Sequence, residues 1–230
     1  MKRPLLPRPA RRRGGFTLME MIIAVAIMAI VVGAAVPVTS RVVTYRARKA
    51  TNEELALLAE ASTEFFRDTG RLPDAVAELL TDPGDSGWRG PYLPGVVADE
   101  LSGLTGYEVD AWSRPYSVSA AGDVLTIASR GEDASFGTDR DLTLATDVTP
   151  VRRAQTLERL RILNNAIALY NAAYQATDPL PADFAQVYAR LTTTGFLPAD
   201  ADFQQDAWGQ PFVEDPLGQA PVVRVGSSSL

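Results

Sequence analysis

The stretch Gly14-Gly15-Phe16-Thr17-Leu18-Met19-Glu20 leads directly into an apolar segment that runs from Met21 to Val36. Between Phe16 and Val36, Glu20 is the only charged side chain. An α-helix needs about 20 mostly apolar residues to cross the ~30 Å hydrocarbon core of a bilayer. The sequence therefore predicts one transmembrane helix, at residues 16–38.

Basic residues precede this apolar segment. The first 15 positions hold no acidic residue and six basic ones, Lys2, Arg3, Arg8, Arg11, Arg12 and Arg13. The positive-inside rule predicts a cytoplasmic N-terminus, with the C-terminal bulk across the membrane. A secretory signal peptide is cleaved after its apolar run, but here the glycine pair comes before it. Cleavage between Gly15 and Phe16 would remove residues 1–15 as a leader and make the apolar helix the new N-terminus.

Glu20 lies four residues after the amine that this cleavage would create on Phe16. That spacing is about one helical turn, so the carboxylate is within reach of this amine or of the amine of a neighbouring copy. An unpaired carboxylate in mid-membrane costs roughly 2.5–3.5 kcal/mol, and such acids usually have a partner. The position of Glu20 therefore indicates that its carboxylate has a partner and a task. The alternative is that Glu20 lies near the cytoplasmic face and is solvated there.

The segment from Gly15 to Glu20, followed by an apolar helix with Pro37 near its end, resembles the class III signal of type IV pilins and type II secretion pseudopilins. The resemblance implies cleavage after Gly15 by a prepilin peptidase, which also methylates the new amine on Phe16. It further implies that the carboxylate of Glu20 neutralises the amine of an adjacent subunit as a helical filament assembles.

Composition narrows the function classes. The 230 residues include no Cys and no His, which excludes disulfides, a Ser-His-Asp triad, a cysteine nucleophile and a His-ligated zinc site. We therefore expect no enzyme, although a hydrolase that uses paired carboxylates stays possible. Removal of the six basic leader residues changes the formal net charge from −6 to −12. Such a surface is a poor match for nucleic acid, whose phosphates bind clustered Lys and Arg.

Beyond Pro37 the apolar residues return at helical spacing as a stripe that ends at Phe65 and Phe66. We expect one helix from near Phe16 to about Asp68, ended by the Gly70 to Pro73 segment. A short helical piece follows at residues 74–80, and an antiparallel hairpin at residues 110–129. These elements predict an α+β, pilin-like fold in which the long helix packs on a small antiparallel sheet.

Four blocks in order resemble the signature of the major pseudopilin of type II secretion, and the resemblance covers residues 14 to about 144. The blocks are Thr69 to Pro73, Gly87 to Leu93, Asp110 to Tyr116, and Ser129 to Asp133. The last block opens an acidic loop, residues 131–141, whose carboxylates are of the type that calcium prefers. The resemblance implies calcium ligation by Asp133, Asp139 and Asp141, although Ala134 stands where a glycine is expected. The alternative is that these acids cap turns on a solvated rim.

The second half of the sequence repeats the first. Asp110-Ala111-Trp112 with Pro115-Tyr116 recurs as Asp206-Ala207-Trp208 with Pro211-Phe212, and Leu72-Pro73 recurs as Leu180-Pro181. Thr51 to Phe65 is likewise echoed by Thr156 to Tyr170. We predict a first globular module at residues 39–147 and a second, similar α+β module at residues 151–230, joined by a linker near residues 145–151.

The sequence thus predicts a pseudopilin subunit of a type II secretion system. Its expected location is the bacterial inner membrane, with both modules in the periplasm. Its expected partners are the prepilin peptidase, other pseudopilin subunits and the inner-membrane secretion platform. The alternatives are a pilin-like subunit of a type IV pilus or DNA-uptake system, and a membrane-tethered binding module that does not polymerise.

Overall fold

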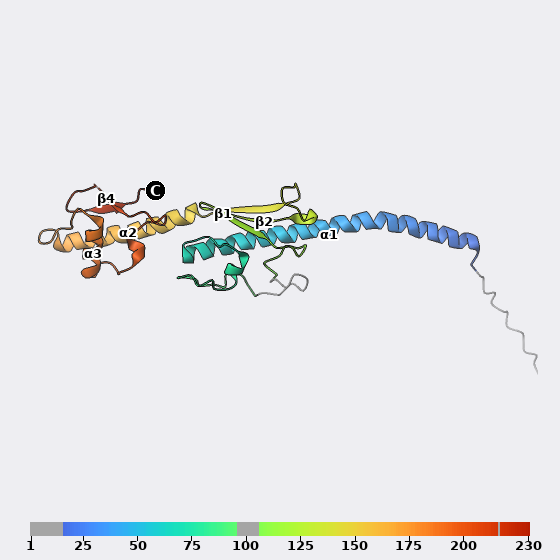
Figure 1. Cartoon of the computed structure of the whole chain (residues 1–230), viewed down its shortest axis with the longest axis horizontal. Helices are drawn as coiled ribbons and strands as arrows, with labels where there is room; N and C mark the ends of the chain where they lie inside the picture. The colour runs from blue at the N-terminus through green and yellow to red at the C-terminus, as the bar shows by residue number, and fades with distance from the viewer. Residues whose placement is uncertain (1–15, 96–105, 216) are drawn as a thin grey trace, which may run out of the picture. The chain divides into compact units, whose positions relative to one another are not determined.

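The computed structural model describes residues 16–95, 106–215 and 217–230, without the side chains of residues 32–39. The leader at residues 1–15, including Gly15, lies outside the described residues. The chain divides into two compact units, Met1–Lys49 and Ala50–Leu230. The secondary structure consists of α-helices, short 3₁₀ helices and antiparallel β-strands, which confirms the α+β, pilin-like fold class (Figure 1).

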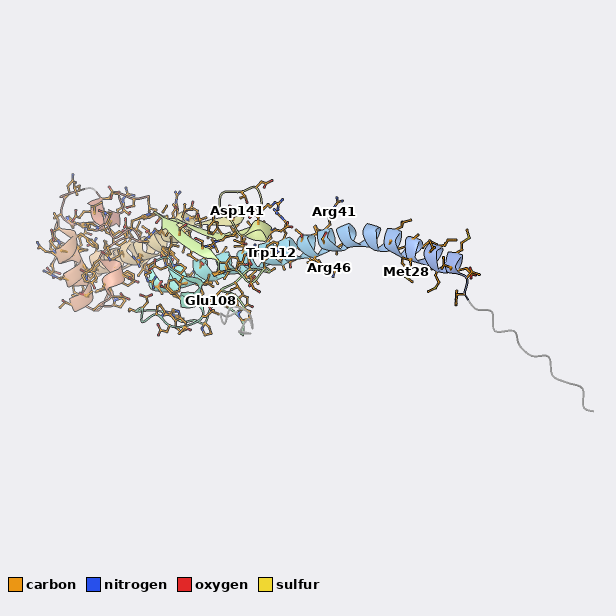
Figure 2. The ribbon with its side chains drawn as sticks, turned by 45° about the vertical axis from the view of Figure 1, so that its right-hand side comes forward. Met28, Arg41, Arg46, Glu108, Trp112 and Asp141 are labelled. Atoms are coloured by element: carbon orange, nitrogen blue, oxygen red, sulfur yellow. The ribbon has the colours of Figure 1, made fainter. Side chains whose placement is uncertain are left out.

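Helix α1 runs without interruption from Leu18 to Thr69 and continues through Pro37. The predicted helix, Phe16 to Asp68, is confirmed to within two residues at each end. In the first unit, apolar side chains such as Met28 are exposed, and Arg41 and Arg46 project from opposite sides of the helix (Figure 2). Within the described part of the chain, no helix combines the length and the apolarity needed to span a bilayer.

A three-stranded antiparallel sheet follows α1 in the chain, in the order β1-β2-β3. The strands are β1 (Ser117–Ala121), β2 (Val124–Ser129) and β3 (Leu142–Asp147). The β1–β2 hairpin confirms the predicted one. Alternation along β2 buries Leu125 and Ile127, which join Leu55, Leu58 and Phe65 of α1 in one hydrophobic cluster. Burial of these side chains is what holds the C-terminal part of α1 to the sheet.

The aromatic residues of the glycine- and proline-rich loop cover the end of this cluster. The rings of Phe65 and Tyr92 meet edge to face with centroids 5.8 Å apart, and Trp88 meets Tyr92 at the same distance. The indole Nε1 of Trp88 donates to the carbonyl of Glu78, which belongs to the short 3₁₀ helix η1 (Val76–Leu79). The predicted helical piece at residues 74–80 is therefore one short 3₁₀ turn.

The predicted linker near residues 145–151 is wrong. β3 extends through Asp147, and only Val148 separates it from helix α2 (Thr149–Tyr174). Pro150 lies in the first turn of α2, where its missing N–H costs nothing because that donor would have no helical partner. Asp123 in the β1–β2 turn accepts from Arg152 Nε at 2.7 Å and from Trp208 Nε1 at 3.0 Å, so further polar contacts accompany this junction.

The remaining elements are short. They comprise α3 (Phe184–Thr193), β4 (Val213–Asp215), β5 (Arg224–Gly226) and the 3₁₀ helices η2 (Gly131–Asp133) and η3 (Ala201–Phe203). α3 lies beside α2, and β4 pairs with β5 in an antiparallel ribbon (Figure 1). Leu163, Ile167 and Tyr170 of α2 form the centre of a second hydrophobic cluster, together with Val187 and Phe212.

Candidate functional site

The first turn of α1 holds Glu20 by reciprocal hydrogen bonds with Thr17. The Thr17 hydroxyl accepts from the backbone N–H of Glu20 at 3.3 Å, and the Glu20 carboxylate accepts from the backbone N–H of Thr17 at 2.8 Å. The Thr17 hydroxyl also donates to Glu20 Oε2 at 2.9 Å. This Thr-x-x-Glu pattern is a capping box, which satisfies two donors at the start of a helix.

The capping box places an acid beside the predicted cleavage point. Phe16 directly precedes Thr17 and is 83% exposed, so its backbone is accessible to a partner. Gly15, on the other side of that peptide bond, lies outside the described residues. A negative carboxylate in the first turn is also favoured by the helix dipole. The arrangement therefore suits an incoming cationic group, such as an amine, with Glu20 as its counter-ion.

A buried polar corner follows α1 in the fold. Asp110 is 4% exposed, and its Oδ1 accepts from the backbone N–H groups of Trp112 at 2.8 Å and Arg114 at 3.0 Å. Its Oδ2 accepts from the Ser129 hydroxyl at 2.5 Å. The hydroxyl of Thr51, on α1, accepts from the backbone N–H of Ala111 at 3.2 Å. The corner thus joins α1, β2 and the segment before β1.

The same corner occurs again in the second half. Asp206 is 1% exposed, and its Oδ1 accepts from Trp208 N and Gln210 N, both at 2.9 Å. Its Oδ2 accepts from the Ser227 hydroxyl at 2.7 Å, and Thr156 of α2 accepts from Ala207 N at 3.0 Å. Burial raises the pKa of Asp206, but hydrogen bonds from the side chains of Ser229 and Ser227 and from the backbone of Gln210 and Trp208 outweigh burial and leave the pKa below its usual value.

The two corners agree bond for bond. Ser129 and Ser227 each also accept a backbone N–H two residues further on, at 3.0 and 3.1 Å. The β-bridge between Val109 and Pro115 has its counterpart between Gln205 and Pro211. The repeat found in the sequence is thus a repeat of atomic contacts. Two partners were not predicted from the sequence: the serine whose hydroxyl donates to the aspartate, and the threonine of the preceding helix, whose hydroxyl accepts the backbone N–H of the residue after the aspartate.

The acidic loop is held by its own backbone. Asp133 Oδ1 accepts from Ser135 N at 3.2 Å, and Asp141, at the end of the loop (Figure 2), accepts from Gly137 N at 2.6 Å. Ala134 has a φ of 63°, so the position where a glycine was expected does adopt the left-handed conformation that favours glycine. Asp139 is exposed.

These contacts match the alternative that the acids cap turns. Among residues 16–95, 106–215 and 217–230, no group of three or more Asp, Glu, His or Cys side chains is placed to hold a metal ion. Ligation by Asp133, Asp139 and Asp141 together would require the loop to exchange these hydrogen bonds for metal contacts. Calcium binding therefore stays a prediction.

The capping box could have been found from the sequence. Thr17 and Glu20 have the Thr-x-x-Glu spacing directly before an apolar run, which is a recognised helix-start signal. The resemblance to the pilin signal assigns a role to Glu20 and none to Thr17. Thr51 and Thr156 occupy equivalent places in the repeat, and their hydroxyl groups at buried helical positions were a second signal.

Comparisons with known proteins identify a family for the N-terminal motif and a relative for a longer part of the chain. Residues 10–36 match a family model described as the prokaryotic N-terminal methylation motif. The chain is 32% identical over 142 residues to the "Type II secretion system core protein G" of Xanthomonas campestris pv. campestris. That alignment covers 60% of this chain and 92% of the relative, so part of this chain extends beyond the alignment. No solved structure matches the chain.

Proposed function

This chain belongs to the family of the type II secretion system core protein G, the pseudopilins, and from this premise we propose that it is a subunit of a secretion pseudopilus. In this proposal a prepilin peptidase removes residues 1–15 and methylates the amine of Phe16. The mature subunit stays anchored in the inner membrane by the apolar part of α1, with its two modules in the periplasm, until it joins the filament.

The observation that carries the proposal is the position of Glu20 at the start of α1. The methylation motif spans this position, and the capping box holds the carboxylate at the end of the helix where the new amine would appear. During assembly, the ammonium group of a neighbouring subunit would replace Thr17 as the main partner of this carboxylate. Pairing two opposite charges in a medium of low dielectric stabilises both of them against desolvation.

The role is structural rather than catalytic. The likeness to core protein G supports a secretion filament over a type IV pilus or a DNA-uptake system. The absence of His and Cys from the whole sequence leaves few groups for hydrolytic chemistry. The proposed partners are the peptidase, other pseudopilin subunits and the secretion platform in the inner membrane.

Replacement of Glu20 by Ala tests the proposal. We expect Glu20→Ala to abolish incorporation into filaments, measured by shearing and sedimentation of assembled material, while the amount of membrane-associated protein is unchanged. Glu60→Ala is the matched control, because Glu60 is an exposed acid on the same helix, outside the motif. Normal filament incorporation of Glu20→Ala would contradict the proposed role and would favour a tethered protein that does not polymerise.

A further inference from the structure

Each copy of the repeat has a surface hollow beside its Pro–aromatic pair. The hollow of the first copy is lined by Asp74, Glu108, Pro115 and Tyr116, among others, and that of the second by Asp183, Gln204, Pro211 and Phe212. Glu108, Pro115 and Tyr116 are each 96 positions before Gln204, Pro211 and Phe212, the offset of the two polar corners. The two hollows are therefore equivalent in the fold.

The hollows differ in size. The first has a volume of about 160 Å³, whereas the second has about 390 Å³. In the first, the hydroxyl of Tyr116 donates to Glu54 Oε2 at 2.8 Å, which fixes the orientation of this lining ring. Phe212 has no such hydroxyl. Since binding pockets typically range from about 300 to 1,000 Å³, only the second hollow has room for a ligand group.

The base of the second hollow is aromatic. Phe184 and Phe212 are 8% and 2% exposed, and their rings meet edge to face with centroids 5.8 Å apart. Tyr188 follows Phe184 by one turn of α3 and lines the same hollow. Its hydroxyl donates to the carbonyl of Asp200 at 2.9 Å, which holds the ring in place. The aliphatic part of a ligand side chain can therefore pack against a rigid aromatic surface.

The rim of the second hollow is acidic. Asp183 and Glu214 line it, and no Lys or Arg is among its lining residues. Asp183 accepts from the backbone N–H of Gln186 at 3.0 Å and caps α3, so the helix dipole partly compensates its charge. Glu214 is half-buried, and its side chain has no hydrogen bond or ion pair with any described residue. Its charge is therefore available to a cation from outside.

We propose that the second module binds an extended polypeptide segment through a lysine or arginine side chain inserted into this hollow. The aliphatic stem packs on Phe184, Tyr188 and Phe212, and the cationic end lies at Glu214 and Asp183. Long basic side chains combine these two properties, an apolar stem and a charged tip. β4, which contributes Glu214, pairs with β5 and with no other described strand, so its second edge can pair with the main chain of the segment. This site goes beyond filament assembly.

Fluorescence anisotropy with the full chain in detergent micelles tests the proposal. The probe is a fluorescein-labelled heptapeptide of alternating Val and Thr with a central Arg, and the comparison peptide has Glu in that place. We expect the Arg peptide to bind and the Glu peptide to bind at least about tenfold more weakly, a difference of ~1.4 kcal/mol. High salt should weaken binding of the Arg peptide, because the rim charges are partly exposed.

Variants locate the binding. Glu214→Gln should weaken binding of the Arg peptide about tenfold. Asp183→Asn should weaken it less, because asparagine still caps the helix and because the helix dipole already compensates part of the charge of Asp183. Ala185→Trp, at an exposed position of the lining, should block the site. Glu60→Gln is the charge-matched control for Glu214→Gln, and Asp82→Asn is the control for Asp183→Asn, since Asp82 also accepts a backbone N–H, from Gly84 at 2.8 Å. Equal affinity for both peptides, no binding of the Arg peptide, or unchanged affinity in Glu214→Gln would each overturn the proposal.

Discussion

The two copies of the repeat keep the same buried corner and differ in almost everything around it. Asp110 and Asp206 make equivalent hydrogen bonds, whereas among the described residues the first copy has a third strand and an acidic loop that the second lacks. The second has instead an α-helix, α3, where the first has one 3₁₀ turn. The comparison teaches that the aspartate corner, with the helix that supports it, is the part of the module that specifies the fold. The elements around the corner differ between the two copies, and the two proposed binding sites lie among these differing elements.

The largest effect should come from the equivalent core leucines. Leu58 and Leu163 are both fully buried, and truncation of either to Ala should cost about 2–5 kcal/mol of unfolding free energy. Hydrogen exchange followed by mass spectrometry would locate the loss. We expect Leu58→Ala to lower protection mainly in β2, and Leu163→Ala mainly in β5. Equal loss in both strands from either variant would mean that the two copies unfold as one unit.

A slightly smaller loss of unfolding free energy is expected when the aspartate of either corner is replaced. Asp110→Ala and Asp206→Ala each remove the acceptor of two backbone N–H groups and one serine hydroxyl, at an expected cost of about 2–4 kcal/mol. Urea denaturation should show both variants destabilised to a similar degree. A corner whose loss costs less than about 0.5 kcal/mol would show that the shared geometry is not a shared source of stability.

A pH-dependent effect is expected at the second corner. Because the folded-state pKa of Asp206 is lowered, its charged form contributes stability that is present above the unfolded pKa of about 4 and is lost as the pH falls through the folded value. Asp206→Asn should therefore flatten the decrease in unfolding free energy below about pH 4. Urea denaturation at several pH values would measure it. An unchanged slope in the variant would contradict the inferred pKa shift.

The smallest effect concerns calcium, which the acidic loop of the first copy alone is predicted to bind. At a calcium concentration ten times Kd, stability should rise by about 1.4 kcal/mol, which is roughly 3–6 °C in Tm for a chain of this size. The double variant Asp139→Asn with Asp141→Asn should remove that rise. If millimolar calcium leaves the Tm of the unaltered chain unchanged, the site does not exist and the acids serve only to cap turns.

Local periodicity predicted the elements whose contacts are close in sequence. The apolar stripe predicted α1, and alternation around the Gly122 turn predicted the β1–β2 hairpin. The sequence does not predict β3, because Asp147 and Pro150 are residue types typical of a linker, although Pro150 is also favourable in a first helical turn. The repeat was visible in the sequence because the corner depends on residue identity at fixed spacing.

The binding features were less predictable, because they depend on residues far apart in the chain. The second hollow joins Asp183 and Phe184 to Phe212 and Glu214, and no spacing rule relates these pairs. The hydroxyl of Tyr116, which lines the first hollow, is held by Glu54, a partner 62 residues away in the chain. Side-chain packing decides such features, and periodicity does not report it.

The N-terminus of the mature protein is the most direct measure of whether this chain is a filament subunit. Mass spectrometry of the chain purified from the membrane fraction of its own host should find Phe16 as the first residue, with one methyl group on its amine. A mature chain that keeps Met1, or begins at any residue other than Phe16, would leave Glu20 without the amine it is proposed to pair with. That result would contradict assembly by this route.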